Sequence, residues 1–332
     1  MATIPATRQT LDVVIATYNR CHLLATALKS LLAARRPEGL SITVTVVDNN
    51  SKDETRAVVQ AIASSDTPFP IRYVFEPKQR RSSALNAGIQ SARGNLIGMI
   101  DDDEEVDPGW FEVILATFSR PDVDFIGGPC RGNWTKYSRP KWIHEASAVL
   151  GIMDYGPKEL RYATDECLGI AMGGNAVYRR PVFDRVGLYN VAVGRSAKGL
   201  ESCEDSEMFE RVIRSGAQGL YVPNLVIYHY IPEHRLNRSY HRRWHFGHGI
   251  SEGVMVRDSV PDTPELFGLP RWRLRFAAEG LVIAIGSLVG LASAKQGFEG
   301  EARFWSLLGY VRGKYFHHAP AVTPAPQAHP VA

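Results

Sequence analysis

Cysteine is scarce in this sequence of 332 residues, and its spacing excludes two kinds of site. The four cysteines lie at positions 21, 130, 167 and 203. They form no C-x-x-C pair, so the sequence indicates neither a zinc site nor a redox motif. We expect reduced thiols in a cytosolic protein. The opening stretch MATIPATRQT has no apolar region of the signal-peptide kind, so we expect no export signal either.

An excess of one charge is also missing. The 38 basic and 35 acidic residues leave a formal net charge of +3, which is too small to indicate a nucleic-acid-binding protein. Glycine is absent from ATYNRCH, residues 16–22, at the end of the first apolar run. A sugar-nucleotide pyrophosphorylase or an NAD-binding oxidoreductase needs a glycine-rich nucleotide loop there, so both classes are disfavoured.

Apolar runs alternate with helical patterns in the first hundred residues. Runs at 11–16, 42–47, 71–75 and 96–100 predict buried strands, and the segments at 23–32, 54–65 and 82–94 predict helices. This alternation predicts an α/β fold with a mostly parallel, Rossmann-like sheet and helices on both faces. Ligands bind at the carboxyl ends of such strands. Polar groups at 17–20, 48–51 and 101–103 occupy three of those ends.

Five consecutive acids, Asp101 to Glu105, end the fourth apolar run. One explanation is a solvated acidic loop, and a second is a calcium loop, although the EF-hand spacing and its central glycine are absent. The third is an Mg²⁺ or Mn²⁺ site shared with a substrate diphosphate, because Mg²⁺ commonly takes one or two carboxylates plus phosphate oxygens. The position beside two other polar strand ends favours this third explanation, with Asp101 and Asp103 as ligands.

The second half of the chain ends in basic and apolar segments. Residues 204–216 predict a helix, 219–230 a strand, and 235–249 form a basic, aromatic stretch. The apolar run from Phe276 to Ala294 follows three arginines and is near the lower limit for spanning a bilayer. A buried helix, an interfacial helix and a short span are all compatible with it. We expect peripheral or monotopic attachment to the cytoplasmic face of the inner membrane.

Six segments together carry a family resemblance. VVIATYNR, VVDNNSKDET, SSALNAGIQSARG, IDDDEEVDPGWFE, GGNAVYRRPVFDRVGLYN and CEDSEMFERVIRSG occur, between residues 11 and 216, in the order typical of family 2 glycosyltransferases of the GT-A fold. The stretch YHYIPEHRLNRSYHRRWHFGHG resembles bacterial exopolysaccharide glucosyltransferases. The resemblance implies an inverting, metal-dependent transferase that uses Mg²⁺ or Mn²⁺. It would move a sugar from a nucleotide-sugar donor, UDP-hexose by this resemblance, to a glycan or polyprenyl-diphosphate-linked acceptor in exopolysaccharide or cell-surface polysaccharide synthesis.

The resemblance also implies roles for donor-site residues. The nucleoside would lie against Thr17, Tyr18 and Arg20, and the uracil against Asp48, although Asn49 stands where the family usually has a second acid. Further donor contacts would come from residues near the diphosphate, the ribose and the sugar: Asn86 with Arg81, Asp102, and Gly174 with Asn175. Glu104 and Glu105 would face solvent.

The metal and catalytic positions follow in the same way. Asp101 and Asp103 match the family's DXD motif, and His229 matches a histidine that meets the metal or diphosphate. Glu204 and Asp205 match the acidic pair in which the aspartate is the general base; two acids at a helix start also complement the helix dipole without any catalysis. The acceptor or diphosphate would contact Arg243 and Trp244. Tyr240 stands where processive relatives have glutamine, which argues against a processive synthase.

We therefore expect three parts. Residues 8–235 would form the GT-A domain, 236–318 a basic and apolar helical region that contacts the acceptor and the membrane, and 319–332 a disordered tail. A nucleotidyltransferase resembling the pyrophosphorylases and a non-catalytic nucleotide-sugar-binding protein are the alternative functions. The non-catalytic alternative gives no reason for both the DXD motif and the Glu204-Asp205 pair to be present.

Overall fold

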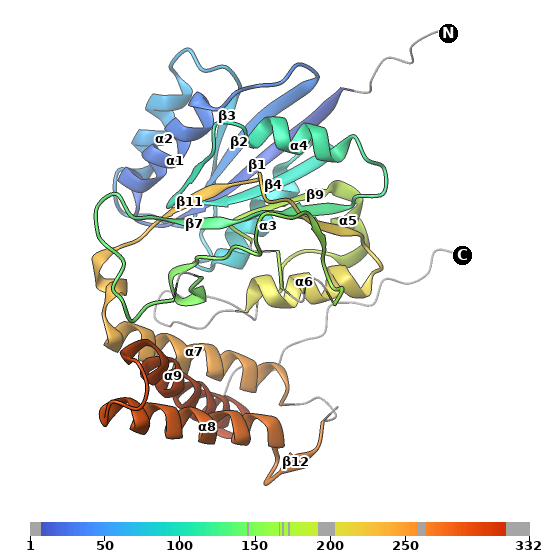
Figure 1. Ribbon diagram of the computed structural model, residues 1–332. Coiled ribbons are helices and arrows are strands. Elements are labelled where there is room, and N and C mark those ends of the chain that lie inside the picture. The colour runs from blue at the N-terminus through green and yellow to red at the C-terminus, as the bar shows by residue number, and fades with distance from the viewer. Residues whose placement is uncertain are drawn as a thin grey trace.

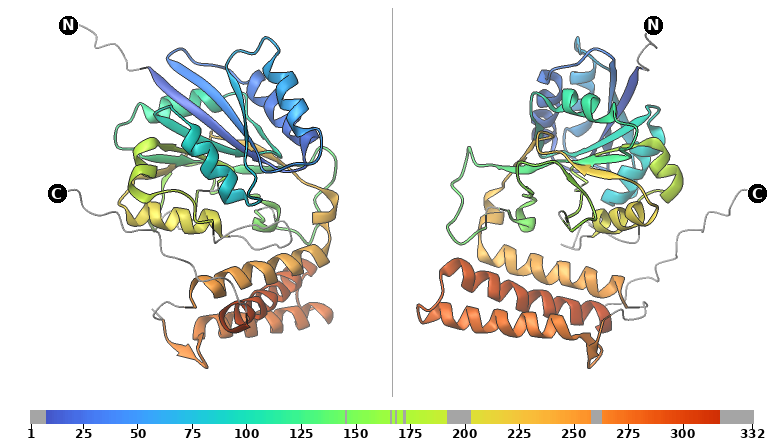
Figure 2. Two further views of the ribbon diagram at one scale, coloured as in Figure 1. Left: turned by 180° about the vertical axis from the view of Figure 1, so that it is seen from behind. Right: turned by 45° about the vertical axis from the view of Figure 1, so that its right-hand side comes forward.

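The computed structural model describes residues 8–144, 146–165, 167, 169–171, 173–191, 203–257 and 263–316 (Figure 1). The tail predicted to be disordered lies outside these residues. An α/β core built around one large sheet occupies the N-terminal two thirds of the chain, and a layer of three long helices lies against one side of it (Figures 1 and 2).

The central sheet has the strand order β3-β2-β1-β4-β9-β6-β10-β8. Strand β1 pairs in parallel with β2 and β4, whereas β9 runs antiparallel between β4 and β6. The mostly parallel sheet expected from the apolar runs is therefore confirmed. The strands are β1 (Gln9–Thr17), β2 (Leu40–Asp48), β3 (Ile71–Phe75), β4 (Leu96–Asp101), β6 (Phe125–Gly127), β8 (Leu160–Arg161), β9 (Asn175–Arg179) and β10 (Gly219–Tyr221).

Helices cover both faces of this sheet. Successive side chains of a strand point to opposite faces, so each strand contributes to two apolar clusters. Val13 and Ile15 of β1 belong to one apolar cluster, while Val14 belongs to the other. The first cluster is completed by α1 (Cys21–Ala33), α2 (Thr55–Ala63) and α4 (Trp110–Phe118). The second is completed by α3 (Arg81–Ser91), α5 (Arg180–Val186) and α6 (Glu204–Arg214).

A second, three-stranded sheet that the sequence did not indicate begins just after β4. It has the order β5-β11-β7, from β5 (Glu104–Val106), β11 (Ile227–Tyr230) and β7 (Cys130–Asn133). The single strand expected over 219–230 is wrong, since a turn separates β10 from β11. The pairing of His229 with Glu104 in this small sheet brings the histidine to the row of acids.

The C-terminal layer consists of α7 (Arg238–Met255), α8 (Arg271–Leu288) and α9 (Ala294–Val311), with a π-helical turn at Arg312–Phe316 and a hairpin of β12 (Glu265–Leu266) and β13 (Leu269–Pro270). Helix α9 packs against both of the others (Figure 2). Glycines permit this closeness: a Cβ at Gly249 would lie 2.2 Å from Ser306 O, and one at Gly300 would lie 2.2 Å from Gly280 O.

The apolar run from Phe276 to Ala294 is not one helix, which corrects the expectation. Helix α8 begins at Arg271 and ends at Leu288, and Gly290 follows with a φ of +79°. Ser293 then caps α9 through a capping box with Gln296. Among the described residues, no helix combines the length and apolar character needed to cross a bilayer.

Candidate active site

A cavity of about 580 Å³ lies at the carboxyl ends of β1 and β4, between the core, the start of α6 and the helix α7. The structure brings eleven of the predicted site residues to its wall: Thr17, Tyr18, Arg20, Arg81, Asp101, Asp102, Asp103, Glu204, Asp205, His229 and Trp244. It adds wall residues for which no catalytic or donor-site role was predicted: Asn49, Arg80, Glu104, Cys203, Arg235 and His248.

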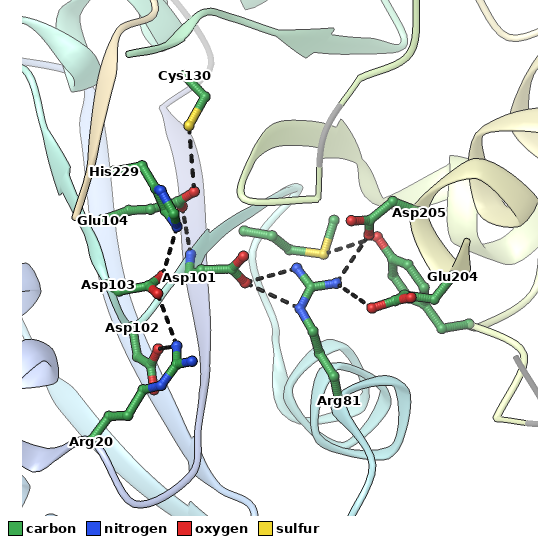
Figure 3. Close-up of polar contacts among 12 residues, drawn as sticks. Arg20, Arg81, Asp101, Asp102, Asp103, Glu104, Cys130, Glu204, Asp205 and His229 are labelled. Carbon is green, nitrogen blue, oxygen red and sulfur yellow. Dashed lines mark hydrogen bonds and ion pairs between the residues drawn. The ribbon is translucent and has the colours of Figure 1, made fainter. Parts of the chain in front are cut away.

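Arg20 balances the charge of the second and third acids of the row (Figure 3). Arg20 donates to Asp102 Oδ1 at 3.0 Å and to Asp103 Oδ2 at 2.9 Å, and Thr17 Oγ1 donates to Asp102 Oδ2 at 2.7 Å. Burial raises the pKa of Asp102 above its usual range, and the adjacent Asp103 carboxylate raises it further. The repulsion between these neighbouring carboxylates is thus relieved by a guanidinium and by the raised pKa of Asp102.

His229 faces the other oxygen of Asp103. Its Nε2 lies 3.5 Å from Asp103 Oδ1, and its Nδ1 is buried without a hydrogen-bond partner among the described residues. Burial opposes ionisation of Asp103, but His229 and Arg20 outweigh it and hold the pKa of this carboxyl well below its usual range. Asp103 is therefore a permanent anion between two cationic or donor groups.

Glu104 corrects the expectation that the fourth acid faces solvent. Its side chain is buried, and Oε2 accepts from Asp101 N at 2.7 Å. Burial raises the pKa of Glu104 well above its usual range, and the Asp101 and Asp103 charges raise it further. Glu104 thus shapes the turn that carries the aspartates, and it is Glu105 that is partly exposed, accepting from Asn133.

Arg81 connects the acidic row to the second acidic pair (Figure 3). Its guanidinium lies 2.7 Å from Asp101 Oδ1, 3.1 Å from Asp205 Oδ1 and 3.4 Å from Glu204 Oε1. Glu204 and Asp205 open α6, where the amide dipoles favour negative charge. The acids at the ends of β4 and at the start of α6 therefore face each other across one cation.

Helix α7 provides the opposite wall of the cavity. Trp244 and His248 stack with ring centroids 4.8 Å apart and planes 10° apart. A flat aromatic surface of this kind suits an apolar sugar face. Arg243, predicted beside Trp244 as an acceptor contact, is exposed, donates to Ser239 Oγ and does not line the cavity.

Four predicted donor contacts lie in the framework instead of on the cavity wall. The Asn86 side chain exchanges two hydrogen bonds with the backbone of Tyr189. Asn175 is fully buried and bonds Trp110 and two carbonyls, while Gly174 leaves room for the Glu104 side chain. Asp48 accepts from Tyr73 Oη at 2.7 Å and from Ser51 N, so its neighbour Asn49 reaches the wall in its place.

The side chains at the end of β4 are of the types that bind a divalent cation. Carboxylates suit Mg²⁺ and Mn²⁺, and Mn²⁺ also accepts imidazole. The described residues contain no ready-made group of three or more metal-binding side chains. However, an Mg²⁺ ion that is shared with a substrate phosphate needs only one or two protein carboxylates. The aspartates of the row can supply that number.

Comparison with known proteins supports this picture. The family model for glycosyl transferase family 2 matches residues 12–187. A succinoglycan biosynthesis protein, ExoM of Rhizobium meliloti, is 25% identical over 251 residues, which cover 75% of this chain and 76% of ExoM. The glucosyl-dolichyl phosphate glucuronosyltransferase of Haloferax volcanii is 24% identical over 74% of this chain and 76% of its own.

A solved structure shares the fold. The mannosyltransferase PcManGT from Pyrobaculum calidifontis, determined in complex with GDP-Man and Mn²⁺, superposes with a TM-score of 0.63. The match covers 95% of this chain and 89% of that one, at 18% identity. The arrangement of sheet and helices described above is therefore that of the GT-A fold.

Proposed function

The chain belongs to glycosyl transferase family 2, and from this premise we propose that it is an inverting, metal-dependent transferase that moves a hexose from a nucleotide-sugar to a lipid-linked glycan. That the protein is a glycosyltransferase follows from the family. One observation carries the finer proposal: in a single cavity, the acids at the end of β4 face the acidic pair at the start of α6.

Asp205 is the proposed general base. In an inverting transfer, the acceptor oxygen forms a bond to the anomeric carbon while the bond from that carbon to the diphosphate oxygen breaks, and the electron pair leaves with the diphosphate. The hydroxyl proton must go to a base, and a positioned carboxylate contributes about 10²–10⁴-fold in rate. Asp205 is partly exposed at the cavity wall and is not covered by the framework.

Asp101 and Asp103 are the proposed metal ligands, with His229 beside them. A divalent cation here would neutralise the diphosphate and stabilise the charge that develops as it leaves. The Arg20 guanidinium balances part of the charge of Asp103 from the nucleotide side. Arg20, Tyr18 and Asn49 line the same end of the cavity, and we assign the nucleoside to it.

The acceptor side of the proposal rests on α7 and on the relatives. Trp244 and His248 of α7 form an aromatic part of the cavity wall. A relative of similar length is named for transfer to a glucosyl-dolichyl phosphate, and another for succinoglycan biosynthesis. The first name favours a polyprenyl-linked sugar as the acceptor class, and the second favours polysaccharide synthesis as its setting.

A panel of nucleotide-sugars tests the donor and the reaction together. The purified protein is incubated with UDP-, GDP- and dTDP-hexoses, with and without Mn²⁺, and the released nucleoside diphosphate is measured with and without a polyprenyl-diphosphate glycan. We expect UDP release from one UDP-hexose that needs the metal and rises with acceptor. Release of pyrophosphate from a nucleoside triphosphate and a sugar phosphate, or binding without turnover, would instead support the nucleotidyltransferase or the non-catalytic alternative.

We also propose attachment to the cytoplasmic membrane surface through α8. Large apolar side chains are exposed along this helix, the turn after it and the preceding hairpin, and we call them the α8 face: Phe267, Trp272, Phe276, Leu281, Val282, Ile285, Leu288, Val289 and Leu291. Apolar patches of this extent are uncommon on soluble monomers. Arg271 and Arg275 are exposed beside the patch, which favours an anionic lipid surface with the helix lying in its plane.

Vesicle sedimentation tests this attachment. We expect the full chain to bind vesicles containing phosphatidylglycerol more than pure phosphatidylcholine vesicles, and to be released by salt. Val282→Ser combined with Ile285→Ser should reduce binding, whereas Phe75→Ser, which removes an exposed apolar group from β3, should not. Equal binding by the double variant would reject the proposal, as would a concentration-dependent dimer that the double variant abolishes, since a second copy would then cover the face.

A further inference from the structure

Two groups, Arg81 and Gly173, lie close to the Asp205 carboxylate. On one side, Arg81 NH1 donates to Asp205 Oδ1 at 3.1 Å. On the other, a Cβ at Gly173 would lie 2.1 Å from the same oxygen, so only glycine leaves the carboxylate its present place. The position of the carboxylate thus depends on one cation and one missing side chain.

Arg81 is itself largely buried and is held by hydrogen bonds to Asp101. Only 17% of its side chain is exposed, and its Nε and NH2 both donate to Asp101 Oδ1, at 3.1 and 2.7 Å. Burial by itself would lower the pKa of this guanidinium, but Asp101, Asp205 and Glu204 raise it well above its usual range. Arg81 is therefore a permanent cation, anchored by one acid at the donor end and oriented toward another at the start of α6.

The contact is not required to join the two helices that it connects. Helices α3 and α6 share an apolar cluster that includes Leu85 and Met208. Asn86 of α3 also holds the backbone of Tyr189 through two hydrogen bonds. Helices α3 and α6 thus belong to one apolar cluster without this ion pair, whereas Asp101 and Asp205, which Arg81 joins, are the acids assigned to the metal and to the base.

We propose that Arg81 is a positioning residue that fixes the orientation of the Asp205 carboxylate relative to the donor. This inference rests on the proposed role of Asp205 as the base. Because Oδ1 accepts from Arg81, Oδ2 is the oxygen left to take the acceptor proton. Arg81 also donates to Asp101, so the position of the base is tied to that of the donor site. In this arrangement Oδ2 faces the attacking hydroxyl when the nucleotide-sugar lies in the cavity.

Three variants test the role of Arg81: Arg81→Gln, Arg81→Lys and, as a matched control, Arg93→Gln, at an exposed position just beyond the far end of the same helix. Displacement of a catalytic group by about 1 Å can lower the rate about 10²-fold, so we expect Arg81→Gln to lower kcat by that order. The KM for the donor and the affinity for UDP with Mn²⁺ should stay near the parent values. Arg81→Lys, which keeps the charge, should recover part of kcat, and Arg93→Gln should equal the parent.

A double-mutant cycle separates positioning from other roles. If Arg81 acts through Asp205, adding Arg81→Gln to Asp205→Asn should not lower transfer below that of Asp205→Asn alone, measured with radiolabelled donor. Additive losses would overturn the proposal. So would a loss of UDP affinity equal to the loss of transfer, which would make Arg81 a diphosphate ligand, or equal rates for the lysine and glutamine variants.

The two proposals fail in different ways. If the parent protein shows no transfer with any donor, the glycosyltransferase assignment of this site fails. If the parent is active and depends on Asp205, but Arg81→Gln is as active as Arg93→Gln, only the positioning role is wrong. Thermal unfolding of each variant shows whether a loss of rate reflects loss of the fold.

Discussion

A single methyl group at position 173 should displace the candidate base without removing it. The Cβ of an alanine there would lie 2.1 Å from Asp205 Oδ1, whereas ordinary contacts begin at 3.4 Å. The carboxylate must therefore move by about 1.3 Å, the difference between these two distances. It is the mobile end of a side chain, so the displacement should affect the position of the base more than the stability of the fold.

We expect Gly173→Ala to lower kcat about 10²-fold, the cost of a misplacement of this size. UDP–Mn²⁺ affinity and the melting temperature should stay close to those of the parent. Transfer to a soluble acceptor analogue and calorimetric titration of UDP measure the two properties. Gly286→Ala, whose Cβ would meet nothing closer than 3.7 Å, is the control. Full transfer activity in Gly173→Ala would refute the assignment of Asp205.

Three other expectations follow from the buried charges. Asp103→Ala should abolish metal-dependent binding of UDP in a calorimetric titration, and unchanged affinity would contradict the metal assignment. Glu104→Gln should keep the fold and the metal affinity, since burial raises the pKa of Glu104 well above its usual range and so favours its neutral form; a large drop in melting temperature would contradict this. Burial lowers the pKa of His241 and of His245 to about 4, below the usual 6.5, so stability present above pH 6.5 should be lost as the pH falls toward 4. The loss should reach about 2 kcal/mol for each group at pH 5, and melting temperatures that do not fall over this range would contradict it.

The local sequence pattern predicted the elements whose burial depends on a short apolar run. The runs at 11–16 and 96–100 were predicted as buried strands of a sheet covered on both sides, and they form β1 and β4. Because ligands bind where the carboxyl ends of parallel strands meet, residues 17–20 and 101–103 were expected at one site, and Arg20 does contact Asp103. Residues on these strand ends were predicted well because their positions depend on short stretches of chain.

The local sequence pattern did not predict the surroundings of residues whose contact partners lie far away in the sequence. Glu104 resembles a surface acid, but its pairing with β11, more than a hundred residues later, buries it. Asn175 resembles a loop amide and instead bonds buried carbonyls. The break after Leu288 depends on Gly290 and on the cap at Ser293, signals weaker than the apolar composition around them. Arg81 joins acids 20 and 124 residues away, which no local spacing reveals.

The most direct measurement of the central claim compares Asp205→Asn with the parent in two assays. The substitution keeps the shape of the side chain and removes its ability to take the acceptor proton. Transfer from the preferred nucleotide-sugar to a polyprenyl-linked acceptor should fall about 10²–10⁴-fold, while calorimetric affinity for UDP with Mn²⁺ stays near that of the parent. Transfer at the parent rate would contradict the account, and so would loss of nucleotide affinity in step with loss of transfer.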